Sequence, residues 1–157
     1  MSSRSCRHDT TIALPARHLL TYLPTYLQVG EGPVAVVLVP THELCQQILQ
    51  EARKFLHVYK IRAVGAHGGV SKYETTKAVK ETAPELVVAT PGRLIDLLRS
   101  RTTNLLRTTL VVLDEADRMF EMGFEYQIRS ILQNVRPDRQ TLLFSATMKV
   151  QPRPTLP

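Results

Sequence analysis

The chain has 157 residues, of which 43% are hydrophobic, and this composition suits one globular domain with a sizeable core. The formal net charge of +6 favours an anionic partner but does not name one, since many basic side chains only cover solvated faces. The two cysteines, Cys6 and Cys45, have neither metal-binding spacing nor the pattern of a disulfide framework, so we expect a reducing compartment. No apolar stretch approaches the ~18 residues of a membrane helix, which argues against a membrane partner.

After Gly30 the sequence alternates between short apolar runs and stretches with helical spacing of apolar residues. The expected strands cover 34–40, 61–69, 85–91, 108–117 and 140–147, and the expected helices cover 43–59, the stretch after Ser71, 91–100 and a stretch interrupted near Gly123. Strands that alternate with helices of this length predict βαβ units around a parallel sheet.

Local signals place the starts of two of these helices. Ser71 with Glu74 predicts a capping box, and Thr90 with Pro91 predicts an N-cap followed by the first helical position. Apolar residues at helical spacing mark the expected inner faces, at Leu44, Ile48, Ala52, Phe55 and Leu56 in one helix and Tyr73, Ala78 and Val79 in the next.

Three acids follow one apolar run directly. Leu110 to Leu113 predicts a buried strand, and Asp114, Glu115 and Asp117 come immediately after it. Open α/β sheets bind ligands at the carboxyl ends of their strands, where one carboxylate holds a hydrated Mg²⁺ and another orients a water molecule. The acids also suit the first turn of the next helix, so this stretch alone leaves both interpretations open.

Five short elements, each at the end of an expected strand, together resemble the DEAD-box RNA helicases. They occur in the family's order over about 32–147: PTHEL (40–44), Gly68-Gly69, TPGR (90–93), DEAD (114–117) and SAT (145–147). The resemblance implies a RecA-like parallel sheet with flanking helices, of the P-loop NTPase type and incomplete at both ends. It also implies ATP hydrolysis coupled to RNA binding and duplex unwinding, with ATP and Mg²⁺ as cofactors.

The resemblance also assigns roles to residues. Asp114 and Glu115 are the expected catalytic pair, with Asp114 holding Mg²⁺ through water and Glu115 polarising the attacking water. The expected nucleotide-binding set is Asp114, Glu115, Asp117, Ser145 and Thr147, and hydrogen bonds between Asp117 and the two hydroxyls are expected to tie it together. The expected RNA-facing set, which grips the backbone independently of sequence, is Pro40, Thr41, His42, Gly68, Gly69, Thr90, Pro91, Gly92 and Arg93.

The sequence departs from the family pattern in two places. No Gly-Lys pair occurs anywhere in it, so the phosphate-binding P-loop is missing, and so is the second RecA-like domain. His42 stands where the family has an arginine, and an imidazole is a poorer phosphate partner than a guanidinium. We therefore expect the chain alone to lack ATPase activity.

Three interpretations remain open. The first is a truncated or alternatively spliced helicase chain; the second is a non-catalytic RNA-binding or regulatory fragment; the third is an unrelated doubly wound domain that binds another Mg²⁺-phosphate ligand. The stretch FEYQIRSILQNVRPDRQTLLFSAT resembles the splicing-associated branch. This resemblance suggests spliceosomal or other RNP partners and a nuclear location, with a cytoplasmic location as the alternative.

The expected domain boundaries follow from where the motifs stop. Residues 1–30 form an expected divergent segment, 31–148 a partial helicase domain, and 149–157 a proline-rich tail. An interior strand and a later strand of the sheet are expected to be missing. An unpaired interior edge promotes aggregation, so we expect the isolated chain to be molten or aggregating.

Overall fold

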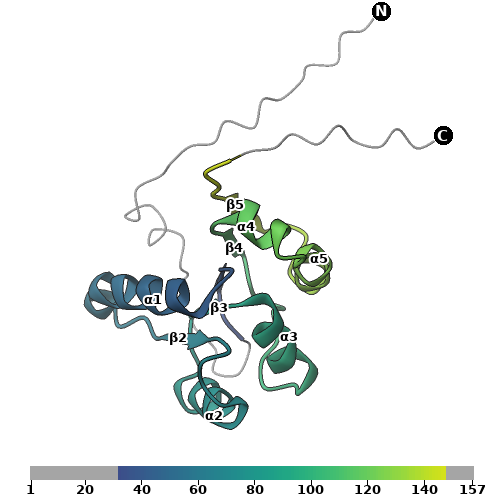
Figure 1. The fold of residues 1–157 in the computed structure, drawn as a ribbon. Coiled ribbons are helices and arrows are strands. Elements are labelled where there is room, and N and C mark those ends of the chain that lie inside the picture. The colour runs from purple at the N-terminus through teal and green to yellow at the C-terminus, as the bar shows by residue number, and fades with distance from the viewer. Residues whose placement is uncertain (1–31, 148–157) are drawn as a thin grey trace, which may run out of the picture.

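The computed structural model describes residues 32–147, so the expected divergent segment 1–30 and the tail 149–157 lie outside the described residues (Figure 1). Within that range the chain forms a parallel five-stranded sheet with strand order β2-β3-β1-β4-β5. The strands are β1 (Ala35–Leu38), β2 (Ala63–Ala66), β3 (Leu86–Ala89), β4 (Leu110–Leu113) and β5 (Gln140–Leu143). Each strand has four residues, which is shorter than expected. The residues directly after the strands, such as Val39 and Asp114, still donate backbone hydrogen bonds to the neighbouring strand.

Helices connect successive strands, which confirms the predicted βαβ alternation. They are α1 (His42–Leu56), continued by the 3-10 turn η2 (His57–Tyr59), α2 (Lys72–Thr82), α3 (Pro91–Arg99), α4 (Ala116–Glu121) and α5 (Glu125–Gln133). The interruption between α4 and α5 falls at Gly123, which has φ +79°. Among residues 32–147, none of the helices has the length and apolar character that crossing a bilayer would require.

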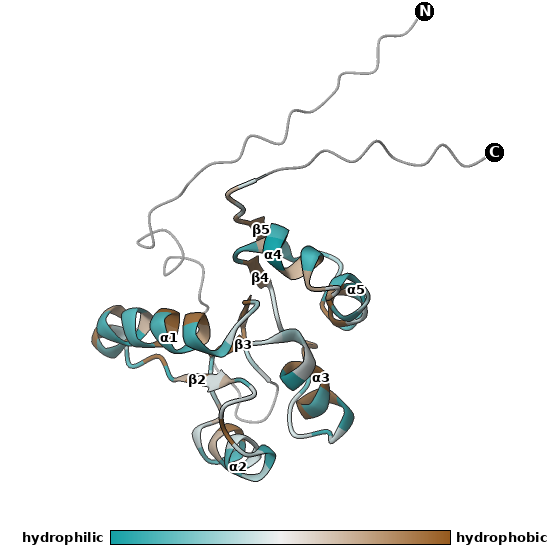
Figure 2. Cartoon of the chain, in the orientation of Figure 1, coloured by the Kyte–Doolittle hydropathy of each residue, from teal (hydrophilic) through white to brown (hydrophobic). Residues whose placement is uncertain are grey.

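The central strands are apolar because both of their faces are covered. β1 pairs with β3 on one side and with β4 on the other, and all four of its residues are buried. Val36 and Leu38 point to the face covered by helices α2 to α5, whereas Ala35 and Val37 point to the face covered by α1. Figure 2 shows the resulting pattern, with brown apolar residues on the central strands, a paler β2, and teal hydrophilic residues on the helices.

The predicted helix starts are largely confirmed. Ser71 and Glu74 form the capping box, and Thr90 occupies the N-cap position before Pro91. The Thr90 side chain, however, makes no capping hydrogen bond. Thr90 is held by its backbone N–H, which donates to the Ala66 carbonyl at 3.0 Å. The expected inner faces are only partly buried, since Phe55 is 51% exposed and Tyr73 is 77% exposed.

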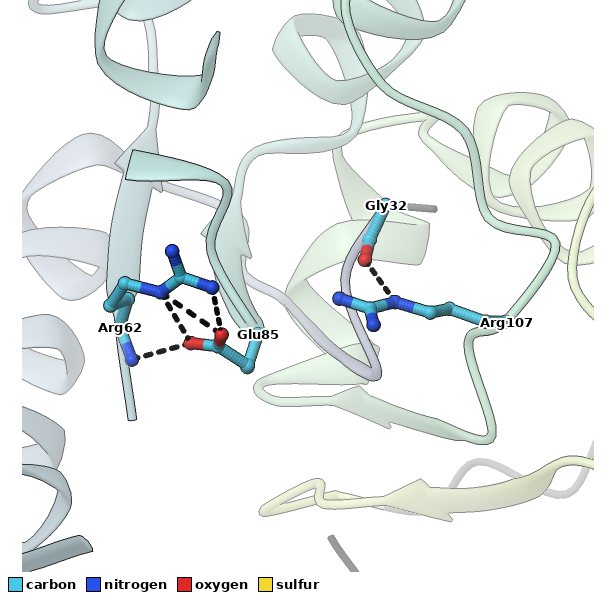
Figure 3. Close-up of polar contacts among 4 residues, drawn as sticks. All are labelled: Gly32, Arg62, Glu85 and Arg107. Carbon is cyan, nitrogen blue, oxygen red and sulfur yellow. Dashed lines mark hydrogen bonds and ion pairs between the residues drawn. The ribbon is translucent and has the colours of Figure 1, made fainter. Parts of the chain in front are cut away.

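Two arginines, Arg62 and Arg107, donate hydrogen bonds at the amino ends of the strands (Figure 3). Glu85 is 2% exposed and accepts hydrogen bonds from the backbone N–H of Arg62 at 2.6 Å and from its Nε at 3.0 Å. Burial acts to raise the pKa of Glu85, but the hydrogen bonds from Arg62 outweigh burial and leave the pKa below its usual value. Arg107 donates to the carbonyl of Gly32, where a Cβ would lie 2.0 Å from the Asn104 carbonyl oxygen. These contacts hold the chain just before β1 and tie the start of β2 to the start of β3.

Candidate functional site

All five sequence motifs lie at the carboxyl ends of the strands, on one side of the sheet, which is called the carboxyl edge below. Because the strands are parallel, their carboxyl ends point the same way, and each motif follows its strand directly. The structure therefore brings together motifs that are up to about a hundred residues apart in the sequence.

Asp114 leaves β4 half-buried at this edge. Its backbone N–H donates to the Leu38 carbonyl at 3.0 Å, and its Oδ1 accepts the N–H of Glu115 at 3.0 Å. Burial raises the pKa of Asp114, the Glu115 N–H lowers it, and the negative charge of Glu115 raises it further, with a net increase. Such a carboxylate gains by meeting a cation.

Glu115 lies at a strained point of the backbone. It has φ 51° and ψ 48°, a left-handed conformation that L-residues with a side chain rarely adopt, and it precedes the first residue of α4. Its Oε2 contacts the Arg118 guanidinium at 3.3 Å, and the Glu115 side chain is 42% exposed. The turn directs a carboxylate outward at the end of a buried strand, and strain of this kind concentrates at functional sites.

Asp117 links the DEAD and SAT motifs. Its Oδ2 accepts hydrogen bonds from the Thr147 hydroxyl at 2.7 Å and from the Thr147 backbone N–H at 3.0 Å, so the expected contact between these residues is present. These bonds, the Thr147 hydroxyl first, lower the pKa of Asp117 to about 2. The Ser145 hydroxyl donates to the Thr147 carbonyl at 3.1 Å, and a second tie joins the Ala116 N–H to the Phe144 carbonyl at 3.0 Å. The end of β4 is therefore coupled to the end of β5.

The acids suit a hydrated Mg²⁺ rather than a metal held only by protein. Within the part of the chain that the structure describes, no group of three or more His, Cys, Asp or Glu side chains could hold a metal ion. Mg²⁺ commonly binds through one or two carboxylates, with water and substrate phosphates as its other ligands. Asp114, whose pKa is raised by burial, fits that mode of binding.

Two helix N-termini open toward the same edge. Thr41 caps α1, and its Oγ1 accepts the Leu44 N–H at 3.3 Å; α3 begins at Pro91, just after Thr90. Free N–H groups and the positive end of the helix dipole make such positions suitable for phosphate groups.

Gly68 and Gly92 are not required by the chain's own packing, whereas a Cβ at Gly69 would lie only 3.2 Å from His67 Nδ1. Gly68 and Gly92 have ordinary backbone angles, since the positive-φ glycines among residues 32–147 are Gly32 and Gly123. A Cβ at Gly68 would meet nothing within 4 Å, and at Gly92 its nearest neighbour would be Gln127 Oε1 at 3.8 Å. Close approach of a ligand explains glycine at these two positions better than an internal turn does.

A histidine pair lies between the PTHEL and GG motifs. The rings of His42 and His67 stack with their centroids 6.1 Å apart, and His42 Nε2 lies 2.9 Å from Glu43 Oε1. His67 is 5% exposed, and its Nδ1 accepts the Gly69 N–H at 3.2 Å. Burial, and then the charges of His42 and Arg93, lower the pKa of His67, which is therefore a neutral ring that supports the GG loop.

Arg93 has a structural role that the sequence did not predict. Its guanidinium donates to the Val70 carbonyl at 2.8 Å and to Thr75 Oγ1 at 3.3 Å, which ties the start of α3 to the loop after β2. A guanidinium carries five N–H donors, so these two contacts leave others that can point toward a phosphate.

The sequence interpretation missed His67 and Gln127. His67 directly precedes the glycine pair, and this position was the available signal. Gln127 comes from α5, and its Oε1 is buried without a hydrogen-bond partner near Gly92. No sequence signal links α5 to the TPGR motif, because their proximity results from the packing of α3 against α5.

Comparison with known proteins identifies the family. The model of the DEAD/DEAH box helicase family matches residues 10–154. The chain belongs to this family. The resemblance that was carried by the five motifs is therefore confirmed.

Individual DEAD-box proteins share both sequence and fold with the chain. ATP-dependent RNA helicase DDX42 from Gallus gallus is 58% identical over 123 residues, and pre-mRNA-processing ATP-dependent RNA helicase PRP5 from Mycosarcoma maydis is 51% identical over 138 residues. The crystal structure of the yeast DEAD-box splicing factor Prp28 superimposes with a TM-score of 0.71 and 38% sequence identity, covering 76% of this chain and 29% of that one. The expected RecA-like fold class is confirmed.

The chain matches only a small part of these relatives. It covers 13% of the DDX42 sequence with 78% of its own length, and 12% of the PRP5 sequence with 86% of its own length. The family match extends from residue 10 to residue 154, and the expected boundaries near residues 31 and 148 stay predictions.

Proposed function

We propose that this chain carries the acidic residues for ATP hydrolysis, at the carboxyl end of β4, and the RNA-facing loops of a DEAD-box ATP-dependent RNA helicase. The observation that carries the proposal is the bond between Asp117 and the Thr147 hydroxyl at 2.7 Å, which joins two motifs on neighbouring strands at the edge that the other three motifs share.

The two acids at the end of β4 have different tasks in this proposal. Asp114, half-buried and with a raised pKa, would hold a hydrated Mg²⁺, and the bound ion would supply positive charge near the phosphate oxygens. Glu115, partly exposed and directed outward by its left-handed backbone, accepts a proton from the water that attacks the terminal phosphate. Asp117 keeps the SAT loop against this pair, so that a change at the nucleotide reaches β5.

RNA lies, in this proposal, across the ends of β1, β2 and β3. The N-termini of α1 and α3 offer N–H groups, and Gly68 and Gly92 leave space above the backbone. Contacts of this kind grip the phosphodiester chain without reading bases, so the binding is independent of sequence.

The biological setting is proposed from the relatives alone. PRP5 is named as pre-mRNA-processing and Prp28 as a splicing factor, and this chain resembles both. We therefore propose an RNP of pre-mRNA splicing as the setting and the nucleus as the location.

A second candidate function is RNA binding without ATP hydrolysis by this 157-residue chain. The specific observation is that the sequence contains the RNA-facing elements but no Gly-Lys pair to cradle phosphates. Without loop amides and a lysine, several charge-assisted contacts of ~1.5–3 kcal/mol each are missing.

A chimaera tests the catalytic assignment directly. Residues 32–147 are placed in yeast Prp28 instead of its equivalent segment, so that the host supplies the phosphate loop and the second domain. We expect RNA-stimulated ATPase activity to be retained, and Glu115→Gln to lower the rate by about 10²–10⁴-fold, the usual contribution of a general base.

Glu125→Gln is the matched control. Glu125 is an exposed acid on α5 that contacts Arg129, so this change should leave the ATPase rate unaltered. An active chimaera whose rate survives Glu115→Gln would contradict the assignment of Glu115.

A further inference from the structure

A small pocket opens at the amino ends of the strands, at the opposite end of the sheet from the carboxyl edge. Its volume is ≈ 200 Å³, and it lies between the end of α2, the loop after α3 and Gly32, which precedes β1. The polar and charged residues of this amino-edge pocket are Lys80, Thr102, Thr103 and Arg107. Pockets for drug-sized ligands have volumes of about 300–1,000 Å³, so this smaller pocket suits a small polar group.

The charge that lines the amino-edge pocket is positive. Lys80 is exposed and has no ion-pair partner among residues 32–147, since the neighbouring acid Glu81 contacts Lys77. Arg107 donates its Nε to the Gly32 carbonyl, which holds the guanidinium at the wall of the pocket (Figure 3). Among residues 32–147, no acidic side chain lines the pocket. Two positive charges without an acid between them favour an anionic occupant.

Helix dipoles account for only part of this positive charge. Lys80 lies in the last turn of α2, where a cation faces the negative end of the dipole. Arg107, however, lies in the loop before β4, and Arg101 lies just beyond α3, directly before Thr102. Arg101 has φ 52°, a left-handed conformation that glycine adopts without strain, so a basic side chain costs stability there. Positive charge next to the pocket is therefore retained where helix capping alone would favour glycine.

We propose that the amino-edge pocket binds a phosphate group. The Lys80 ammonium and the Arg107 guanidinium supply the opposite charge to the phosphate oxygens. The Thr103 hydroxyl has only a long contact of 3.4 Å with the Asn104 carbonyl, so it can rotate and donate to a phosphate oxygen instead. Val79 contributes to an apolar wall, which keeps water from one side of the bound group.

This phosphate pocket is separate from the sites at the carboxyl edge. A four-residue strand is about 13 Å long, so a group at the amino ends of the strands does not contact the acids after β4 or the RNA-facing loops. The inference therefore does not rest on the proposed function. A phosphate group reaches the pocket from one of two sources, the backbone of a further stretch of RNA or a small free phosphate compound, and both present the same oxygens.

Titration calorimetry of the full 157-residue chain with inorganic pyrophosphate tests the proposal. The buffer contains no Mg²⁺, so that the acids of the carboxyl edge do not hold the probe through a metal ion. We expect saturable binding, and we expect Lys80→Gln to raise the dissociation constant about tenfold, the effect of one charge-assisted hydrogen bond. Lys80→Arg keeps the positive charge and should retain most of the affinity.

Lys77→Gln is the matched control. It removes the same charge from an exposed position three residues earlier on α2, where the side chain contacts Glu81 and does not line the pocket. This change should leave pyrophosphate affinity unaltered. Absence of saturable binding, or equal weakening by Lys77→Gln and Lys80→Gln, would overturn the proposal, because diffuse attraction to a basic surface would then explain any binding.

Fluorescence anisotropy with a labelled single-stranded RNA distinguishes the two sources of the phosphate group. If an RNA backbone occupies the pocket, Lys80→Gln should weaken RNA binding more than Lys77→Gln does. If a small free compound occupies it, the two variants should bind RNA equally while only Lys80→Gln weakens pyrophosphate binding. Either result, together with the pyrophosphate titration, supports a phosphate pocket at this place.

Discussion

Replacement of Gly92 by alanine should change stability and RNA affinity in opposite directions. Gly92 is the second residue of α3, its φ is not positive, and the new Cβ would have Gln127 Oε1 as its nearest neighbour at 3.8 Å, an ordinary contact. Alanine at a compatible position restricts the unfolded chain, so we expect the free energy of unfolding to rise by about 0.4–1 kcal/mol.

The same methyl group occupies the space above the N-terminus of α3, where the proposal places an RNA phosphate. Loss of one backbone hydrogen bond costs about 1–1.5 kcal/mol, so the dissociation constant should rise roughly five- to tenfold. Urea unfolding measures the first effect, and fluorescence anisotropy with a labelled single-stranded RNA measures the second.

Gly123→Ala is the matched control. Gly123 has φ +79°, so alanine there should destabilise the fold by about 1 kcal/mol and leave RNA affinity unchanged. If Gly92→Ala bound RNA as tightly as the unaltered chain, the proposal that an RNA phosphate approaches the backbone at Gly92 would be wrong.

Three further predictions address charge and the sheet edge. Asp114→Asn should raise the melting temperature at neutral pH, because burial and Glu115 disfavour the charged carboxylate. The difference in melting temperature between the variant and the unaltered chain should disappear as the pH falls through the raised pKa of Asp114. A variant that melts at a lower temperature than the unaltered chain at neutral pH would contradict this. His42→Arg should strengthen RNA binding several-fold at low salt. His57→Arg in η2 adds the same charge and should not strengthen RNA binding. An equal increase in RNA affinity in both variants would show that the PTHEL loop has no special role. Among residues 32–147, β5 is one of the two edge strands of the sheet. The N–H groups of Gln140 and Phe144 point to β4, so alternation directs the Thr141 N–H outward. Thr141→Pro should therefore slow aggregation measured by light scattering, Thr141→Val should not, and identical rates would show that association does not use this edge.

The local features of the fold were predictable because their causes are local in the sequence. The apolar run from Leu110 to Leu113 and the capping box of Ser71 and Glu74 depend on neighbouring residues, and both are confirmed. The shared edge of the motifs also followed from parallel strands, whose carboxyl ends must meet.

Other features depend on contacts between distant segments and could not be predicted. Glu85 lies in what looked like an apolar strand, and only Arg62, 23 residues away, explains why a buried acid is tolerated there. Phe55 has the spacing of an inner-face residue but is 51% exposed, and the structural role of Arg93 depends on the loop after β2. The left-handed backbone of Glu115 leaves no mark in the sequence.

The most direct test of the account is a single titration of RNA binding with and without Mg-ATP. The 157-residue chain is titrated against two unrelated single-stranded RNAs at several salt concentrations, in the presence and absence of Mg-ATP. We predict similar affinities for both sequences, a steep loss of affinity with salt, and no effect of Mg-ATP below millimolar concentrations, since the sequence lacks a phosphate cradle. Absence of RNA binding, or an RNA affinity that changes at micromolar Mg-ATP, would contradict the account.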